Sequence, residues 1–513
     1  MFWRRVSLAG CLLLGCDTSD PSGSDEGAST SGSGGSVGPG SANEASGGAS
    51  SADSPDSGTS SGDSTDKGGD ETTGGDEPSP IDPDRPTFYV SVSGDDANPG
   101  TEEAPWRTVQ HGVNAIAPGD QLVALDGDFD ENVIIDRDGE SEARLSVIAA
   151  TSHGAKIRSV VIRGDYVDLI GFEVEAGLEE LTGVFVDDGH EVVVQGCYVH
   201  DCPLGGIDVS GSSIAALSTD VTVVDNLAEH NGQWGIHIVG SRILVEDNEI
   251  AESVQHHPKG DPPNFTGADA DGLRVFGDNH IIRGNFIHDI ADPADAEHNI
   301  DPHADCIQTW DRQDQGGRPV MTHSVIERNR CIIQHPSGKG LMMSAIHSNA
   351  CHHITVRNNI FEFRDEGVEA SQGMFHDIYI YNNVFKANLD DTPWGVSVNF
   401  HQSAGNYDVR NNIIVDCHAE ARSISSADGI VDHNLVWYSD GSAPSGTPGP
   451  MPNELWGVDP MFVDYDGSPG GDYRLRDGSP AIDAGTTIEG VDDDHDGNAR
   501  PDGGSHDIGA YER

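Results

Sequence analysis

The sequence predicts an all-β fold: a right-handed, single-stranded parallel β-helix with an N-terminal capping helix. The first observation behind this prediction is a repeat with two apolar positions separated by one variable residue. The first apolar column reads Ile207, Ile236, Leu273, Ile307, Leu341, Val368 and Val396. The second column reads Val209, Ile238, Val275, Thr309, Met343, Ala370 and Val398. Such alternation is typical of strands with one buried face.

The second observation is an asparagine that follows another short apolar run in each repeat. These residues are Asn226, Asn248, Asn285, Asn329, Asn359, Asn383 and Asn412, with Phe172 and Cys197 in the same place earlier. Their spacing varies from 22 to 44 residues, as expected when loops of different length interrupt a constant unit. Asparagine tolerates left-handed turns, and stacked asparagines can hydrogen-bond between coils. A β-propeller is the alternative, but most repeats are too short for four strands.

The N-terminal residues predict export. Arg4 and Arg5 precede a short apolar run, Val6–Leu14, which is too short for a permanent membrane span. The run leads into Cys16 in a pattern that resembles a bacterial lipobox, so residues 1–16 are expected to be a lipoprotein-type signal peptide, with simple secretion as the alternative. Residues 17–85 are rich in Ser, Gly and Asp and predict a disordered acidic tether. We therefore expect a cell-surface lipoprotein or a secreted protein.

The remaining chain divides into a β-helix domain, residues 86–437, and a C-terminal segment, residues 438–513, that packs on it or caps it. Beyond residue 85 there are 72 acidic and 24 basic residues. This charge repels nucleic acid and anionic lipid, so neither is expected as a partner, and membrane contact is expected only through the lipid anchor. It also favours calcium, a cation that takes oxygen ligands. We expect a monomer.

Local patterns predict further features of these two parts. Trp106–Ala117 has helical spacing and would cover the open end of the coil stack. Asp492–Gly497 has the alternating acids of a calcium loop, or forms a plain acidic turn. Six cysteines follow the signal, and their pairing cannot be assigned from the sequence.

Three residues in one column, Asp271, Asp305 and Lys339, mark the predicted site. Long inserts lie beside them in consecutive coils, and such loops cluster around functional faces. By strict alternation these side chains would face inward, where charges are too costly. The following Gly or Cys must therefore mark a bend that turns them outward.

The same column predicts a calcium site and a sugar-binding face. Adjacent coils lie about 4.8 Å apart, so carboxylates of Asp269, Asp271 and Asp305 can converge on one ion. Alternatively, these acids form structural ion pairs with Lys339 and Arg274. The predicted substrate-binding residues are Gln308, Trp310, Phe276, Glu369 and His303, with Phe276 and Trp310 as a flat aromatic floor.

Two further stretches carry a family resemblance. Phe88–Gly100 resembles the opening of many secreted bacterial β-helix proteins, and Asp472–Gly485 with Asp507–Glu512 resembles a C-terminal segment of surface-attached ones. The aspartates and Lys339 resemble the calcium-aspartate cluster and lysine base of family 9 pectate lyases, within the pectate-lyase-like superfamily. In that family the lysine follows the glycine, whereas Lys339 precedes Gly340.

This resemblance implies a calcium-dependent polysaccharide lyase that cleaves an acidic, uronate-containing polysaccharide by β-elimination. Lys339 and Arg274 are then the catalytic residues. Two other functions remain open. One is a glycoside hydrolase with paired carboxylates drawn from Asp271, Asp305, Glu366 or Glu369. The other is a surface protein that binds glycans without catalysis, since the fold alone does not decide function.

Overall fold

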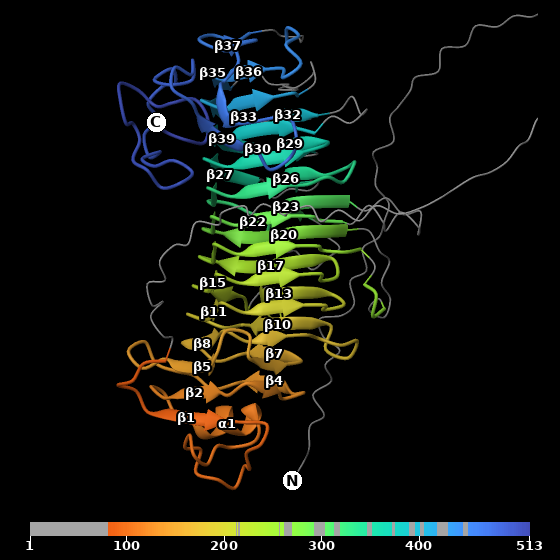
Figure 1. Cartoon of the computed structure of the whole chain (residues 1–513), viewed down its shortest axis with the longest axis vertical. Helices are drawn as coiled ribbons and strands as arrows, with labels where there is room; N and C mark the ends of the chain where they lie inside the picture. Colours follow the sequence, from red (N-terminus) through yellow and green to blue (C-terminus); the bar gives the residue numbers. More distant parts are fainter. Residues whose placement is uncertain are drawn as a thin grey trace, which may run out of the picture. The chain divides into compact units, whose positions relative to one another are not determined.

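The coils of the chain contribute short strands to three parallel sheets, and the coils stack from β1 at one end to β37 at the other (Figure 1). The computed structural model describes residues 81–513, except 212, 214–215, 256, 261–268, 292–302, 312–318, 346–350, 372–374, 389–394, 401–404, 418–428 and 445–449; residues 303 and 345 are described by their backbone only. The predicted signal peptide with Cys16, and all of the tether before residue 81, lie outside these residues.

The first sheet consists of β1 (Thr87–Val90), β2 (Gln121–Ala124), β5 (Leu145–Ala149), β8 (Val167–Ile170), β11 (Val193–Gln195), β15 (Thr222–Val224), β18 (Leu244–Glu246), β21 (Ile281–Arg283), β24 (Val325–Glu327), β27 (Cys351–Arg357), β30 (Phe375–Tyr381), β33 (Gly405–Arg410) and β35 (Ile430–Asp432).

The second sheet consists of β4 (Asn132–Ile135), β7 (Ser159–Ile162), β10 (Thr182–Asp187), β13 (Gly205–Ser210), β17 (Trp234–Ser241), β20 (Asp269–Asp278), β23 (His303–Asp311), β26 (Lys339–Ala345), β29 (Glu366–Ser371) and β32 (Val396–Phe400), with β14 (Ser218–Thr219) paired to β17.

The third sheet consists of β3 (Gly127–Asp128), β6 (Ala155–Ile157), β9 (Glu173–Val174), β12 (Tyr198–His200), β16 (Leu227–Glu229), β19 (Glu249–Ala251), β22 (Phe286–His288), β25 (Arg330–Ile332), β28 (Ile360–Phe363), β31 (Val384–Ala387), β34 (Ile413–Val415), β36 (Leu435–Trp437) and β37 (Leu455–Trp456).

The core fills the interior between these sheets, and the predicted apolar columns line it. Ile236, Leu273, Ile307, Leu341 and Val368 follow one another in register and are fully buried. The predicted register fails in the last coil. Val368 pairs with Val398, not with Val396, so β32 is displaced by two residues from the predicted alignment. Asn399, not Ser397, is therefore the outward neighbour of Glu369.

The predicted asparagine ladder is present and has one further rung, Asn434. From Asn226 onward, each side-chain Nδ2 donates to Oδ1 of the next rung at 2.9–3.0 Å. The left-handed position was predicted one residue too late. It is taken by the residue before each rung, such as Asp225 with φ 56° and Asn358 with φ 56°. The side-chain amide of the rung itself forms hydrogen bonds with the neighbouring coils.

The two ends of the stack are covered differently. Helix α1 (Val109–Ala115) begins after the cap Thr108 and is shorter than the predicted Trp106–Ala117. Its Val109 and Val113 join the core beside β1 and β2, and Figure 1 shows α1 beside β1 at the end of the stack. After β37, the antiparallel pair β38 (Phe462–Asp464) and β39 (Asp472–Leu475) packs against outward residues of the third sheet, among them Ile360 and Val384.

Two further observations concern the C-terminal segment and the helices. Within the acidic turn, Asp494 accepts hydrogen bonds from the backbone N–H groups of Asn498 and Glu512, at 2.7 and 3.0 Å. Protein donors thus hold this carboxylate. No helix among the described residues has the length and apolar character needed to cross a membrane.

Candidate functional site

The entrance of each site strand has two consecutive inward residues. In β20, a Cβ added to Gly272 would lie 2.4 Å from Cγ2 of Ile287 in the third sheet, and the next residue, Leu273, is in the core. Two inward residues in a row break the alternation of an extended chain. The bend predicted from the sequence is therefore present, and it leaves Asp271 on the outer face with Arg274, whose Nε donates to Asp271 Oδ2 at 2.6 Å.

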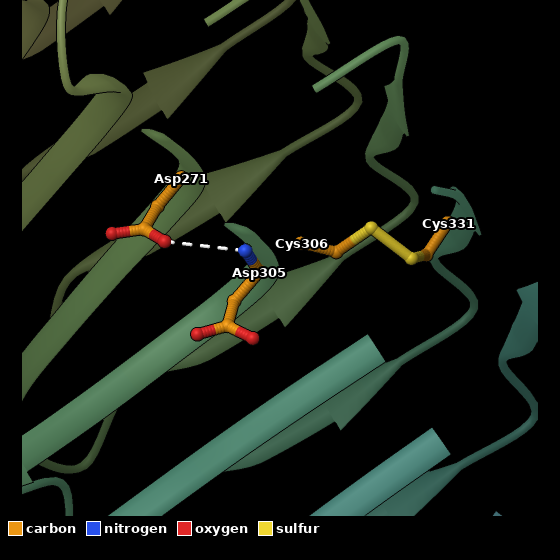
Figure 2. The surroundings of a disulfide bond; sticks show 4 residues. All are labelled: Asp271, Asp305, Cys306 and Cys331. Atoms are coloured by element: carbon orange, nitrogen blue, oxygen red, sulfur yellow. Dashed lines mark hydrogen bonds between the residues drawn. A yellow bond between two sulfur atoms is a disulfide. The ribbon is translucent and has the colours of Figure 1, made fainter. Parts of the chain in front are cut away.

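A disulfide replaces this glycine in the next coil. Cys306 occupies the place of Gly272, and its sulfur bonds to Cys331, which pairs in register with Ile287. Their Cα atoms are 6.1 Å apart. Figure 2 shows the disulfide on one side of the second-sheet strands and the carboxylates of Asp271 and Asp305 on the other. The covalent bond thus fixes the backbone beside Asp305.

The two aspartates are register partners, as predicted, and both are fully buried. Asp271 Oδ1 accepts a hydrogen bond from the backbone N–H of Asp305 at 3.2 Å (Figure 2). Asp305 Oδ2 accepts one from Gln308 Nε2 at 2.9 Å. Burial raises the pKa of Asp271 to about 8, with Arg274 opposing and the charges of Asp269 and Asp305 adding to the rise. The carboxyl of Asp271 therefore holds a proton more readily than an exposed aspartate does.

Arg274 is the cation nearest these carboxylates. Its Nη2 lies 3.5 Å from Asp269 Oδ2, in addition to the bond with Asp271. Its guanidinium carbon lies 4.8 Å from the ring centroid of Trp234 and 5.4 Å from that of Trp310. Contacts of this kind stabilise a cation on two aromatic faces. Arg274 is thus held between neighbouring coils.

The three aspartates have the ligand chemistry that calcium needs, but their carboxylates are not close enough together to bind one ion as they stand. Asp269, Asp271 and Asp305 supply oxygen ligands, which calcium prefers. Among the described residues, the groups of three acids or histidines whose ligand atoms lie within 4.8 Å are elsewhere. A calcium ion would have to draw these carboxylates together and take over from Arg274 as their countercharge.

Lys339 lies one coil beyond Asp305 and is 8% exposed. Its Nζ is 3.4 Å from Glu369 Oε2 and 3.5 Å from Asp365 Oδ2. Burial lowers the pKa of Lys339, but Glu369, Asp305, Asp365 and Glu366 outweigh it and raise the pKa well above its ordinary value. Burial also raises the pKa of Asp365, against the opposing charge of Lys339. In the resting protein Lys339 is an ammonium.

The predicted flat aromatic floor is not flat. Phe276 is 1% exposed, and its ring meets Trp310 edge to face, at 81° and 4.6 Å between centroids. The cause is packing: Phe276 lies against Val320, which forms a bridge with it, and near His237. Trp310 alone is partly exposed. His303 pairs with Asp269 along the backbone, and its side chain lies outside the described atoms.

Several residues of the candidate site were not assigned from the sequence. Asp365 precedes a strand and was not compared with Lys339. Asn399 donates to Glu366 Oε1 at 2.5 Å and was hidden by the register error. Trp234 was not assigned either, although its place next to Asp271 in register signals the contact with Arg274.

Comparison with known proteins identifies the fold. Residues 147–293 match the family model described as a right handed beta helix region. The fold is a right-handed β-helix. The chain is 25% identical over 176 residues to the uncharacterized protein YwoF of Bacillus subtilis (strain 168). That match covers 32% of this chain and 35% of YwoF, so it spans about a third of the relative's length.

Two solved structures resemble this β-helix over most of its length. Pectate lyase Pel9A has a TM-score of 0.55 and 17% identity, covering 84% of this chain and 96% of its own. XylC, solved in complex with xylose, has a TM-score of 0.52 and 11% identity, covering 83% of this chain and 98% of its own. At these identities the likeness concerns the fold.

Proposed function

We propose that the protein is an extracellular polysaccharide lyase that cleaves a uronate-containing polysaccharide by calcium-dependent β-elimination. The observation that carries the proposal is the outward row of Asp271, Asp305 and Lys339 in three consecutive coils, with Arg274 beside it. Pel9A, of similar fold, is a pectate lyase, which supports testing this reaction first.

The chain's own residues have distinct roles in this proposal. Asp269, Asp271 and Asp305 would hold the calcium, which when bound neutralises the uronate carboxylate and acidifies the C5 proton. Lys339 accepts that proton on Nζ, and the C5–H electrons form the C4–C5 double bond. The C4–O bond breaks with its electrons on the glycosidic oxygen, which takes a proton from water. Arg274, released from the aspartates by the calcium, faces the substrate carboxylate. Gln308, Glu369, Trp310 and His303 are proposed to contact the sugar.

The electrostatics set a condition on this mechanism. Lys339 can accept a proton only when neutral, and Glu369 and Asp365 hold it as an ammonium in the resting protein. Added positive charge in the row lowers the pKa of Lys339, so the base becomes available only in the loaded complex. This condition ties activity to the cation.

Export is part of the proposal. The Cys306–Cys331 disulfide supports it, because such bonds persist in oxidising compartments. Anchoring through a lipid on Cys16 and a monomeric state belong to the same proposal.

The test is a screen of polyuronates and neutral polysaccharides with the purified protein. Ultraviolet absorbance of unsaturated ends and the yield of reducing ends are read with calcium and with EDTA. We expect an ultraviolet signal with calcium that EDTA abolishes. Reducing ends without that signal would exclude elimination, and glycan binding without products would leave a binding protein.

A glycoside hydrolase is the second candidate, because the surroundings of Lys339 contain an acid with a raised pKa, Asp365, near a second carboxylate, Glu369. Such a pair can divide the roles of general acid and base. In this case Asp365→Asn abolishes the release of reducing ends, and EDTA has no effect.

A further inference from the structure

Four histidines from three consecutive coils form an array at the entrance of the first sheet. They are His323, which precedes β24, His352 and His353 in β27, and His376 in β30. No role was predicted for these histidines from the sequence, and they lie on a different sheet from the proposed catalytic row.

Coil stacking creates the array. His323 and His353 stack with ring centroids 4.7 Å apart, and His352 and His376 stack at 4.8 Å. The two stacks meet where His352 Nδ1 lies 2.8 Å from His353 Nδ1. His323, His352 and His353 each offer a ring nitrogen within 4.8 Å of the others.

Asp377 lies beside two rings of the array. Its Oδ2 is 2.7 Å from His376 Nδ1 and 3.7 Å from His353 Nε2, while its Oδ1 accepts a hydrogen bond from Asn406. A carboxylate behind the far nitrogen of a histidine is the usual support of a metal-bound imidazole. His353 therefore presents Nδ1 toward His352 with Nε2 directed at Asp377.

We propose that His323, His352 and His353 bind a divalent transition-metal cation of the Zn²⁺ class, with Asp377 orienting His353. Imidazole nitrogens suit Zn²⁺, Ni²⁺ or Cu²⁺ and not calcium, so the site differs in chemistry from the aspartate row. Zn–N bonds of about 2.0–2.1 Å put ligand nitrogens about 3.4 Å apart, so small side-chain shifts close the site. The side chain of His353 is 48% exposed, which leaves a coordination position open to water.

Stacking alone is a weaker account of the array. Exposed rings bury little apolar surface, and the two facing Nδ1 atoms require opposite tautomers of His352 and His353. A cation bound by both nitrogens removes that requirement. The acidic chain, with a formal net charge of −59, favours any cation at its surface.

A second group, Asp201, His230 and His257, also brings ligand atoms within 4.8 Å and serves as a comparison. Here the backbone N–H of Lys259 donates to His257 Nδ1 at 3.2 Å. Neutral His257 then carries its proton on Nε2, the nitrogen that faces Asp201 at 3.9 Å. A metal there would have to displace that proton and the Lys259 hydrogen bond, so we choose the histidine array.

The experiment is calorimetric titration of the EDTA-stripped full chain with Zn²⁺, in excess calcium to occupy oxygen sites. His353→Asn and His323→Asn are the test variants, because both positions have positive φ (56° and 48°) that asparagine tolerates. His230→Gln is the control. We expect each test variant to lose about 100-fold in affinity, and the control to change less than about threefold.

A second readout is the thermal midpoint, which Zn²⁺ should raise in the wild-type chain and in His230→Gln but not in the test variants. The proposal is overturned if the wild-type chain binds no Zn²⁺, if both test variants bind as tightly as wild type, or if His230→Gln alone loses binding. Circular dichroism confirms folding of each variant, and two independent test variants keep the result decisive if one misfolds.

Discussion

The ammonium of Lys339 lies 3.4 Å from the carboxylate of Glu369, and this ion pair sets the chemistry that the row can perform. As long as Glu369 is ionised, it stabilises the protonated lysine and withholds the proposed base. The same pair orients Nζ on the outer face of β26, within one coil of Asp305. The Lys339–Glu369 ion pair therefore both positions the proposed base and keeps it protonated.

Replacing Lys339 tests the base directly. Lys339→Met should lower the rate of unsaturated product formation by about 10²–10⁴-fold, the usual contribution of a positioned proton acceptor. Lys156→Met is a matched control, because Lys156 also pairs with two carboxylates, Glu173 and Glu175, in a distant coil. Equal losses in both variants would point to a general effect on folding.

Replacing Glu369 tests the restraint. Glu369→Gln removes a negative neighbour, which lowers the pKa of Lys339 and enlarges its neutral fraction at any given pH. The rising limb of the pH–rate profile should therefore move to lower pH. The measurement is initial rate against pH under saturating substrate, and an unmoved limb would remove Lys339 as the titrating base.

The aspartate row is tested by Asp305→Asn, which keeps the shape of the side chain and removes one charge. Calcium affinity should fall by about tenfold or more, because charge count tunes such sites. Activity should fall with it and recover partly at high calcium. Thermal midpoints with calcium and with EDTA provide the check. A loss of stability that is the same in both would make Asp305 a structural partner of its neighbours.

The disulfide gives a stability prediction. Cys306→Ala with Cys331→Ala should cost about 2–4 kcal/mol, measured by urea unfolding, since the bond restricts the unfolded chain. Cys306→Gly with Cys331→Ile recreates the Gly272–Ile287 contact of the preceding coil. It should recover part of that loss. No recovery would show that packing at this position is not interchangeable between coils.

His280 predicts a pH dependence of stability. Burial lowers its pKa to about 4, while its Nδ1 accepts from the backbone N–H of Ile243. Below about pH 6.5 His280 binds a proton in the unfolded chain but not in the folded chain, so the free energy of unfolding decreases as the pH is lowered. The decrease levels off near the pKa of His280 in the folded protein. The loss should reach about 2 kcal/mol at about pH 5. In His280→Gln, the free energy of unfolding from urea curves should decrease less between neutral pH and about pH 5.

Much of the fold followed from the sequence because each coil repeats the same physical problem. Leu273, Ile307 and Leu341 had to face inward, and Asn285 and Asn329 had to stack. The β32 register was missed because Val396 and Val398 both fit an apolar column. The disulfide was missed because it depends on which third-sheet residue faces Cys306, and that alignment appears only in three dimensions.

The histidine array did leave a signal in the sequence. His323, His353 and Asp377 each stand six residues before a ladder asparagine, namely Asn329, Asn359 and Asn383. Counting back from the ladder aligns these three residues in one column. The site prediction rested instead on the apolar columns, which belong to the second sheet. The electrostatics of the aspartate row were less accessible, because the burial of Asp271 and the contacts of Arg274 depend on neighbouring coils.

The asparagine ladder also bears on how such a chain can change over generations. Each rung from Asn248 to Asn412 meets the same chemical group above and below, an amide donor on one side and an amide acceptor on the other. A whole coil could be duplicated or deleted between any two rungs, and the new neighbours would still recognise each other. The molecule can thus lengthen or shorten by units, while the connections beside the second sheet diversify independently.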